Sequence, residues 1–119
     1  MAVTLNFSPM PVINPIYYLA NRGGIPRIET TGGTVTTTAV TYTFSSDVSF
    51  SQNYNGIVLV KINHSIPSDT TTTLPVYFSS TNGGTKAVTK YNDDSLTVAD
   101  LSGTGIYLIY YGNGKIQIL

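Results

Sequence analysis

His64 is the single histidine of this chain, and it stands between Asn63 and Ser65, directly after an apolar segment. Together with Ser65 and Asp69 it supplies the residue types of a Ser-His-Asp hydrolase, in which the imidazole accepts the serine proton and the carboxylate orients the imidazole. Adjacency along the chain does not create that geometry, and no serine has the Gly-x-Ser-x-Gly context of a nucleophile elbow. We therefore expect His64 to make a loop or strand-end hydrogen bond and not to catalyse a reaction.

Carboxylates are the second possible source of chemistry. A glycosidase needs two of them roughly 5 to 10 Å apart, but Glu29 is the one Glu, and the five Asp residues fall in predicted turns, which Asp favours. Asp93, Asp94 and Asp100 offer oxygen ligands for Ca²⁺ without the regular spacing of a calcium loop. The glycine-rich segments 103–105 and 112–114 lack the lysine of a phosphate-binding loop. We predict no enzyme, no metal site and no cofactor.

Neutral hydroxyl groups dominate the composition. The chain has 18 Thr and 11 Ser, against six basic and six acidic residues that give a net charge of +0. This balance provides no electrostatic attraction for nucleic acid, which we exclude as a partner. It also removes the long-range repulsion between copies, so that close packing against a neighbouring subunit is favoured. With no Cys, the fold must be held by packing and backbone hydrogen bonds.

Neither export nor membrane insertion is expected. The N-terminus alternates polar and apolar residues, without the early basic residues and continuous apolar segment of a signal peptide. The longest apolar runs are far shorter than the roughly 18 residues that span a bilayer. We expect a protein made in the cytoplasm, with no membrane partner.

From about residue 31 the pattern is typical of strands. Val40, Tyr42 and Phe44 alternate with hydroxyl residues, Val48 and Phe50 repeat the alternation, and Leu96 and Val98 predict a further short strand. The run 57–62 predicts a central strand covered on both faces, and the segments 106–111 and 115–118 predict a terminal hairpin. Residues 65–73, which we expect to lack apolar anchors, predict a mobile, exposed loop. Seven or eight strands at such spacing predict an all-β domain over residues 31–119, an antiparallel β-sandwich or jelly roll.

Residues 1–30 differ in composition. They hold four of the six prolines, which exclude a helix and disfavour sheet pairing, so we predict an extended N-terminal arm. An extended segment cannot bury its own apolar side chains. These side chains need another surface, either this chain's own domain or a neighbouring subunit, and we favour the subunit. The predicted docking residues are Phe7, Met10, Val12, Ile13, Ile16, Tyr17, Tyr18, Arg22 and Arg27.

Four apolar segments carry a family resemblance: IVLVKI at 57–62, LPVYF at 74–78, GIYLIYY at 105–111 and IQIL at 116–119. Over about the last 65 residues the chain resembles virion accessory proteins of tailed bacteriophages, namely the capsid auxiliary and head-fibre proteins of crAss-like phages. The resemblance implies a protein of the virion surface that decorates or stabilises the capsid or anchors a fibre. Its implied partners are the major capsid protein and other virion proteins, and a homo-oligomer remains open.

A non-catalytic carbohydrate-binding module is the alternative, because small β-sandwiches often have that role. Such modules usually present Trp and Tyr on a flat face. Here Trp is absent, and Tyr107 and Tyr111 belong to a strand that is apolar on both sides. The sequence therefore favours the assembly role.

Overall fold

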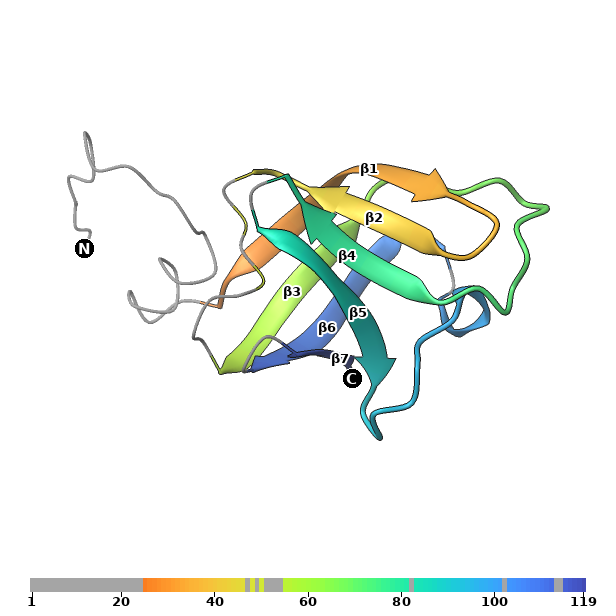
Figure 1. The fold of residues 1–119 in the computed structure, drawn as a ribbon. Coiled ribbons are helices and arrows are strands. Elements are labelled where there is room, and N and C mark those ends of the chain that lie inside the picture. Colours follow the sequence, from red (N-terminus) through yellow and green to blue (C-terminus); the bar gives the residue numbers. More distant parts are fainter. Residues whose placement is uncertain are drawn as a thin grey trace, which may run out of the picture.

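Seven strands and one short 3₁₀ helix form the regular structure in a computed structural model, which describes residues 25–46, 48, 50, 55–81, 83–101, 103–112 and 115–119. The strands are numbered in chain order, and Figure 1 colours them along the chain from orange β1 to blue β7. They are β1 (Arg27–Val35), β2 (Val40–Phe44), β3 (Gly56–Ile62), β4 (Val76–Ser80), β5 (Gly84–Lys90), β6 (Gly105–Gly112) and β7 (Lys115–Ile118), with the helix η1 (Val98–Asp100) between β5 and β6.

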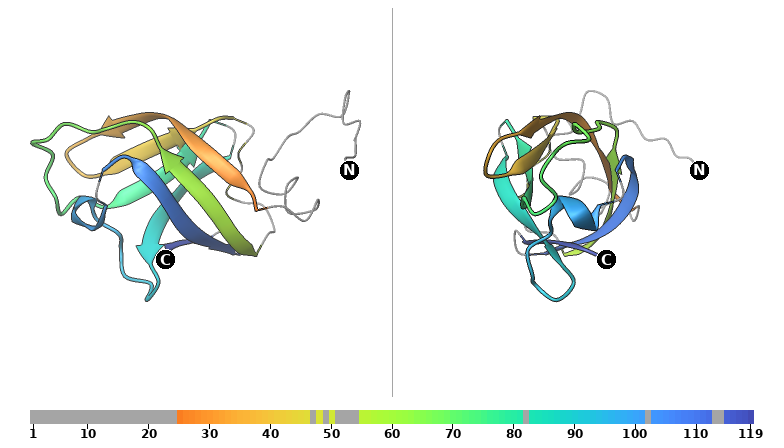
Figure 2. Two further views of the ribbon diagram at one scale, coloured as in Figure 1. Left: turned by 180° about the vertical axis from the view of Figure 1, so that it is seen from behind. Right: turned by 90° about the vertical axis from the view of Figure 1, so that its right-hand side faces the viewer.

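The strands close into a barrel in the order β1-β2-β4-β5-β7-β6-β3, with β3 pairing back to β1. The right-hand view of Figure 2 shows this ring end-on. Three neighbouring pairs are parallel, namely β1–β3, β2–β4 and β5–β7. A closed ring with an odd number of strands requires an odd number of parallel pairs, because strand direction must return to its starting value after one circuit. The all-β prediction is confirmed, whereas the antiparallel sandwich or jelly roll is not.

Two strands turn the corners of the barrel. Residues 27–29 of β1 pair with β3, and residues 30–35 pair with β2. A register shift between Thr30 and Gly32 marks the bend. A Cβ atom on Gly32 would lie 3.0 Å from Thr43 Oγ1, so glycine permits the close approach of the two strands. β5 behaves similarly, pairing with β4 through residues 84–87 and with β7 through residues 88–90.

The barrel interior is the hydrophobic core. Val40, Tyr42 and Phe44 of β2 are buried, as their alternation predicted. In β3 the residues Val58, Val60 and Ile62 are buried, but the alternate residues of the strand are half-buried or exposed. The prediction of a strand covered on both faces is therefore wrong, because a barrel wall has only one face toward the core.

An aromatic cluster closes the barrel end at which β1 begins. The ring centroid of Phe44 lies 5.0 Å from that of Phe78 and 5.6 Å from that of Phe50, and Phe50 lies 6.2 Å from Tyr111. These three pairs meet edge to face, the favourable arrangement for aromatic rings. Phe50 and Val48 are buried in the segment after β2 and belong to none of the seven strands. Their neighbours in the strand predicted there, residues 47, 49 and 51–54, lie outside the described residues.

Two long loops cover the opposite end, where β3 and β5 finish. Backbone hydrogen bonds join these loops, since Val98 N–H donates to Leu74 O at 3.1 Å and Ala99 N–H donates to Thr72 O at 3.0 Å. Ile66 and Leu74 pack against the core. The prediction that residues 65–73 lack an apolar anchor is wrong, because Ile66 is that anchor. The predicted strand at Leu96 and Val98 is replaced by isolated bridges and by η1.

Buried and half-buried residues alternate along β4, so substitutions of two neighbouring residues test which side chains point into the barrel. Phe78 is 2% exposed, so Phe78→Ala is expected to lower the free energy of unfolding by about 3 to 5 kcal/mol. Its neighbour Tyr77 is half-buried on the outer wall, and Tyr77→Ala is expected to cost about 1 kcal/mol or less. Urea denaturation of both variants measures the difference. Equal losses would contradict the assignment of Phe78 to the core.

Candidate functional site

His64 joins the loop after β3 to the strand β1. Its Nδ1 lies 2.8 Å from Oγ1 of the buried Thr30, and the same oxygen accepts the backbone N–H of Asn63 at 2.9 Å. Asn63 Nδ2 also donates to Glu29 Oε1 at 2.9 Å. Because these contacts satisfy a buried hydroxyl, they hold the loop to the barrel. The prediction of a strand-end hydrogen bond for His64 is confirmed.

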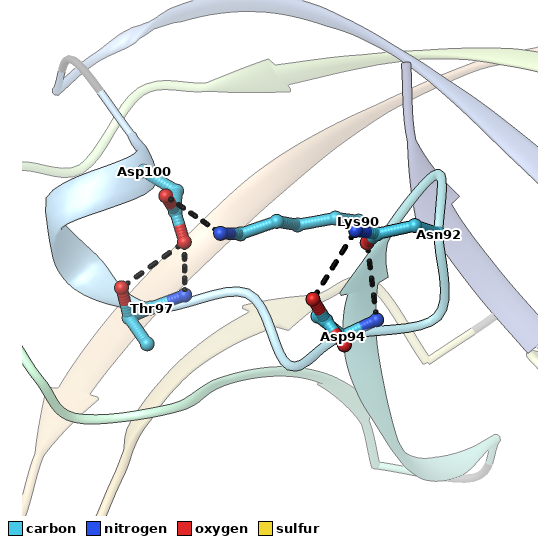
Figure 3. A network of polar contacts seen from close by, with 5 residues as sticks. All are labelled: Lys90, Asn92, Asp94, Thr97 and Asp100. Atoms are coloured by element: carbon cyan, nitrogen blue, oxygen red, sulfur yellow. Dashed lines mark hydrogen bonds and ion pairs between the residues drawn. The ribbon is translucent and has the colours of Figure 1, made fainter.

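The carboxylates near the end of β5 form turns (Figure 3). Asp100 Oδ2 accepts Thr97 N–H at 2.9 Å and the Thr97 hydroxyl at 3.0 Å, and Lys90 Nζ lies 3.4 Å from Asp100 Oδ1. Asp94 Oδ2 accepts Asn92 Nδ2–H at 3.1 Å, and Asp93 Oδ1 accepts a hydrogen bond from Gln117. Within the part of the chain that the structure describes, no group of three His, Asp or Glu residues is placed to hold a metal ion.

An exposed apolar surface lies on the outside of the barrel, over β3, β6 and the chain segments beside them. Along β6 the inward residues alternate with Ile106, Leu108 and Tyr110, which are 66%, 46% and 39% exposed. On β3 the half-buried Ile57 and Leu59 point to the same side. We call this surface the β3–β6 outer face, and it consists of Ile57, Leu59, Ile106, Leu108, Tyr110 and Leu119.

Strand register makes the β3–β6 outer face continuous. Leu59 is the cross-strand partner of Leu108, and Ile57 is the partner of Tyr110. At the β7 side, Leu119 N–H donates to Leu108 O at 3.0 Å. Opposite cross-strand residues lie about 4.5–5.5 Å apart between Cβ atoms, so these side chains form one patch. Contiguous exposed apolar patches on soluble proteins usually mark interaction sites.

Charged residues lie on β1 beside this face and at the end of β3 within it. Arg27 pairs with Leu59 in the register between β1 and β3, and Glu29 pairs with Lys61 in the same two strands. All three charged residues are exposed. The face therefore has an apolar centre around Leu59 and Leu108, with Lys61 beside Ile106 at one end and with charges of both signs along β1, and a polar rim of this kind is found in protein interfaces.

Of the predicted docking residues, Arg27 lies at the edge of the β3–β6 outer face. The others lie outside the described residues, as does most of the predicted arm: Phe7, Met10, Val12, Ile13, Ile16, Tyr17, Tyr18 and Arg22. Residues 27–30, which the sequence assigned to the arm, form the first part of β1.

The sequence analysis did not single out the exposed Ile106, Leu108 and Tyr110 as candidate docking residues. The signal was present, because residues 106–111 are apolar on both faces of a strand. A second covered face was assumed, but the barrel leaves that side to the solvent. Tyr111 is fully buried and Tyr107 is half-buried with its hydroxyl donating to Gly103 O at 2.6 Å. These two tyrosines do not form a flat sugar-binding platform.

A pocket of about 440 Å³ opens at the barrel end that the two long loops cover. Hydroxyl side chains from the loop after β3 line one side, and residues from η1 and the segment after it line the other. Tyr42, which is 3% exposed, contributes from the barrel itself. Burial, and secondarily the neighbouring Tyr107, raise the pKa of the Tyr42 hydroxyl above its usual 10.0. The phenol is therefore neutral at physiological pH.

Comparison with known proteins does not assign a family, since no family model, curated protein or solved structure matches the chain. Among the described residues, no helix is long and apolar enough to cross a membrane. Within the described residues, the β3–β6 outer face and the pocket between the loops are two candidate surfaces for function.

The turn at Asp100 predicts a pH-dependent contribution to stability. Hydrogen bonding from the Thr97 backbone, and then from the Thr97 hydroxyl and Lys90, lowers the pKa of Asp100 below its usual 3.8. A carboxyl with a lowered folded-state pKa stabilises the fold above the unfolded value, and this contribution is lost as the pH falls through the folded value. Asp100→Asn should therefore be less stable than the native chain near neutral pH, with a difference that shrinks below pH 3.8.

Urea denaturation across this pH range measures the difference between the native chain and Asp100→Asn. Thr97→Val keeps the backbone hydrogen bond, the largest cause of the shift, so it should retain more of the pH dependence than Asp100→Asn. A stability difference that does not change with pH would contradict the role given to this carboxylate.

Proposed function

We propose that this protein is a non-enzymatic structural component of a virion that binds a neighbouring capsid protein through the β3–β6 outer face. The observation that carries the proposal is the row of exposed Ile106, Leu108 and Tyr110 on a strand whose other side forms the core. Exposed apolar area costs roughly 25 cal/mol per Å² relative to burial. A partner that covers these side chains recovers that free energy.

Closure of the barrel limits how a partner can bind. Each strand of the ring has a hydrogen-bonded neighbour on both sides, although β1 and β5 pair with their two neighbours through different halves of the strand. No described strand is therefore open along its whole length to the addition of a foreign strand. Docking on this wall must therefore use side-chain packing. Tyr110 suits this role, since tyrosine combines a large contact area with a polar tip and is enriched among the residues that dominate binding energy.

The absence of a side chain at Gly112 leaves room for the Tyr110 ring. A Cβ atom on Gly112 would lie 2.9 Å from Tyr110 Cε2 and 2.6 Å from Asn55 Oδ1. The ring therefore lies over glycine backbone, beside Asn55, at the end of β6. Packing of this kind restricts the side chain before binding, which lowers the entropy lost when a partner immobilises it.

The proposed association depends on apolar contact and does not need attraction between opposite charges on the two proteins. The chain has no net charge, and the outer face carries both signs, with Arg27 and Glu29 on β1 at its margin and Lys61 beside Ile106. Since charged groups separated by more than a Debye length are largely screened at physiological ionic strength, binding should depend only weakly on salt. Apolar contacts of this kind suit a permanent assembly such as a capsid.

The capsid setting is supported by the family resemblance, and two of the segments that carry it, 57–62 and 105–111, contribute most of the outer face. In this proposal the major capsid protein is the partner, the protein is made in the host cytoplasm, and it resides on the capsid surface. The N-terminal arm is the second docking element. The apolar face is available for capsid docking or for contact between copies of the chain, and the particle experiment distinguishes these two occupants.

Removal of side chains from the outer face tests the proposal. The chain is coexpressed with the major capsid protein, and particles are purified by sedimentation. Leu108→Ala combined with Tyr110→Ala should lower the amount bound at limiting concentration by about tenfold or more. Tyr77→Ala is the matched control, because it removes a tyrosine from the opposite wall. Undiminished binding of the double variant, with unchanged folding, would contradict the proposal, as would loss of self-association without loss of particle binding.

Deletion of residues 1–24 tests the arm separately. The deletion leaves β1 intact, since this strand begins at Arg27, and the barrel should therefore fold. If the arm docks on the capsid, the shortened chain should be lost from particles during sedimentation, and the arm of the full chain should resist protease when particle-bound. Unchanged occupancy by the shortened chain would exclude the arm as a docking element.

A further inference from the structure

The pocket between the two long loops is lined in part by neutral hydroxyl groups. Four of the residues that line it are serine or threonine, namely Ser65, Ser68, Thr70 and Thr72. The Thr70 hydroxyl donates to Pro67 O at 2.6 Å. The other three hydroxyls have no hydrogen-bond partner among the described residues. Each hydroxyl group can both donate and accept a hydrogen bond, so the wall suits a ligand with the same dual capacity.

Apolar residues from both loops complete the lining. They are Val98, Ala99 and Leu101 from η1 and the residue after it, and Ile66 and Pro67 from the loop after β3. No residue with a charged side chain is found among the described residues that line the pocket. An anionic or cationic ligand would lose hydration there without gaining an opposite charge, which is unfavourable. The lining therefore selects for an uncharged ligand that has both apolar surface and hydroxyl groups.

The pocket is held open by its own backbone. Hydrogen bonds join Leu74 to Val98 and Thr72 to Ala99, and the Thr97 and Asp100 capping interactions fix the turn of η1. Since these backbone groups already bond to each other, an extended peptide cannot pair with them. A volume of about 440 Å³ lies within the range of roughly 300–1,000 Å³ typical of small-molecule sites.

We propose that the pocket binds a neutral saccharide unit. The hydroxyls of the sugar would exchange hydrogen bonds with Ser65, Ser68 and Thr72, and the C–H face of its ring would pack against Val98 and Leu101. An acyl chain fits less well, because it would desolvate the hydroxyl wall without replacing those hydrogen bonds. The buried Tyr42 also lines the pocket, with a neutral phenol.

The pocket lies away from the two elements proposed to dock on the capsid, the arm and the β3–β6 outer face. It lies at the barrel end where β3 and β5 finish, whereas the arm joins the barrel at the end where β1 begins, as the parallel pairing of β1 with β3 requires. A protein bound to a particle through its arm and its outer wall would present this end to the medium. The saccharide would then belong to the surroundings of the particle and not to the particle itself.

The experiment is saturation-transfer NMR of the full chain with neutral monosaccharides and disaccharides, alongside glucuronic acid and sialic acid. At least one neutral sugar should receive saturation, and the acidic sugars should receive less. Titration of the best neutral sugar then compares the native chain with a Ser65→Ala and Thr72→Val double variant, whose affinity should be about tenfold lower. Thr38→Val, on another loop at the same end, is the matched control and should bind as the native chain does.

Ala99→Phe provides a second variant, because it fills the pocket from an exposed position without removing a hydroxyl, and it should abolish binding. Thermal unfolding of each variant verifies that the fold is retained. The proposal is overturned if no neutral sugar binds, if acidic sugars bind better, or if the double variant and Ala99→Phe bind as well as the native chain.

Discussion

Closure of the β-sheet into a ring is the constraint on which the rest of this structure depends. Backbone hydrogen bonding from β1 round to β3 leaves one buried face, the barrel interior, and every other strand side chain must point outward. The interior takes the alternating Val, Ile and aromatic residues. The outward residues of β6 are equally apolar but have no cover within the described chain. Because a barrel has no second sheet to pack against them, their burial requires something outside the barrel.

The two ends of the barrel are closed differently, and this difference separates two kinds of surface. At the end where the arm joins, Phe44, Phe50 and Tyr111 pack edge to face and fill the interior. At the other end the loops bond to each other above the core and leave the hydroxyl-lined pocket between them. One end is therefore suited to a rigid connection, and the other is suited to a small ligand.

Local patterns predicted much of the secondary structure but not the architecture. The alternation at Val40, Tyr42 and Phe44 and the terminal hairpin were readable because a strand has a period of two and because glycine marks its turns. The parallel pairs were not readable, since they join segments distant along the chain, and no local signal records ring closure. For the same reason residues 57–62 suggested a strand covered on both faces. Likewise, the serine and threonine residues of the loop after β3 gave no sign that η1 lies opposite them.

Covalent labelling of tyrosine on assembled particles tests the central claim most directly, because it reports which surface of the barrel a partner covers. In the free protein Tyr110 and Tyr91, which are 39% and 77% exposed, should both react. On particles the account predicts that Tyr110 is protected while Tyr91, on the turn after β5, remains reactive. Equal reactivity of Tyr110 in the free and particle-bound protein would show that the outer wall stays in solvent, and would contradict the account.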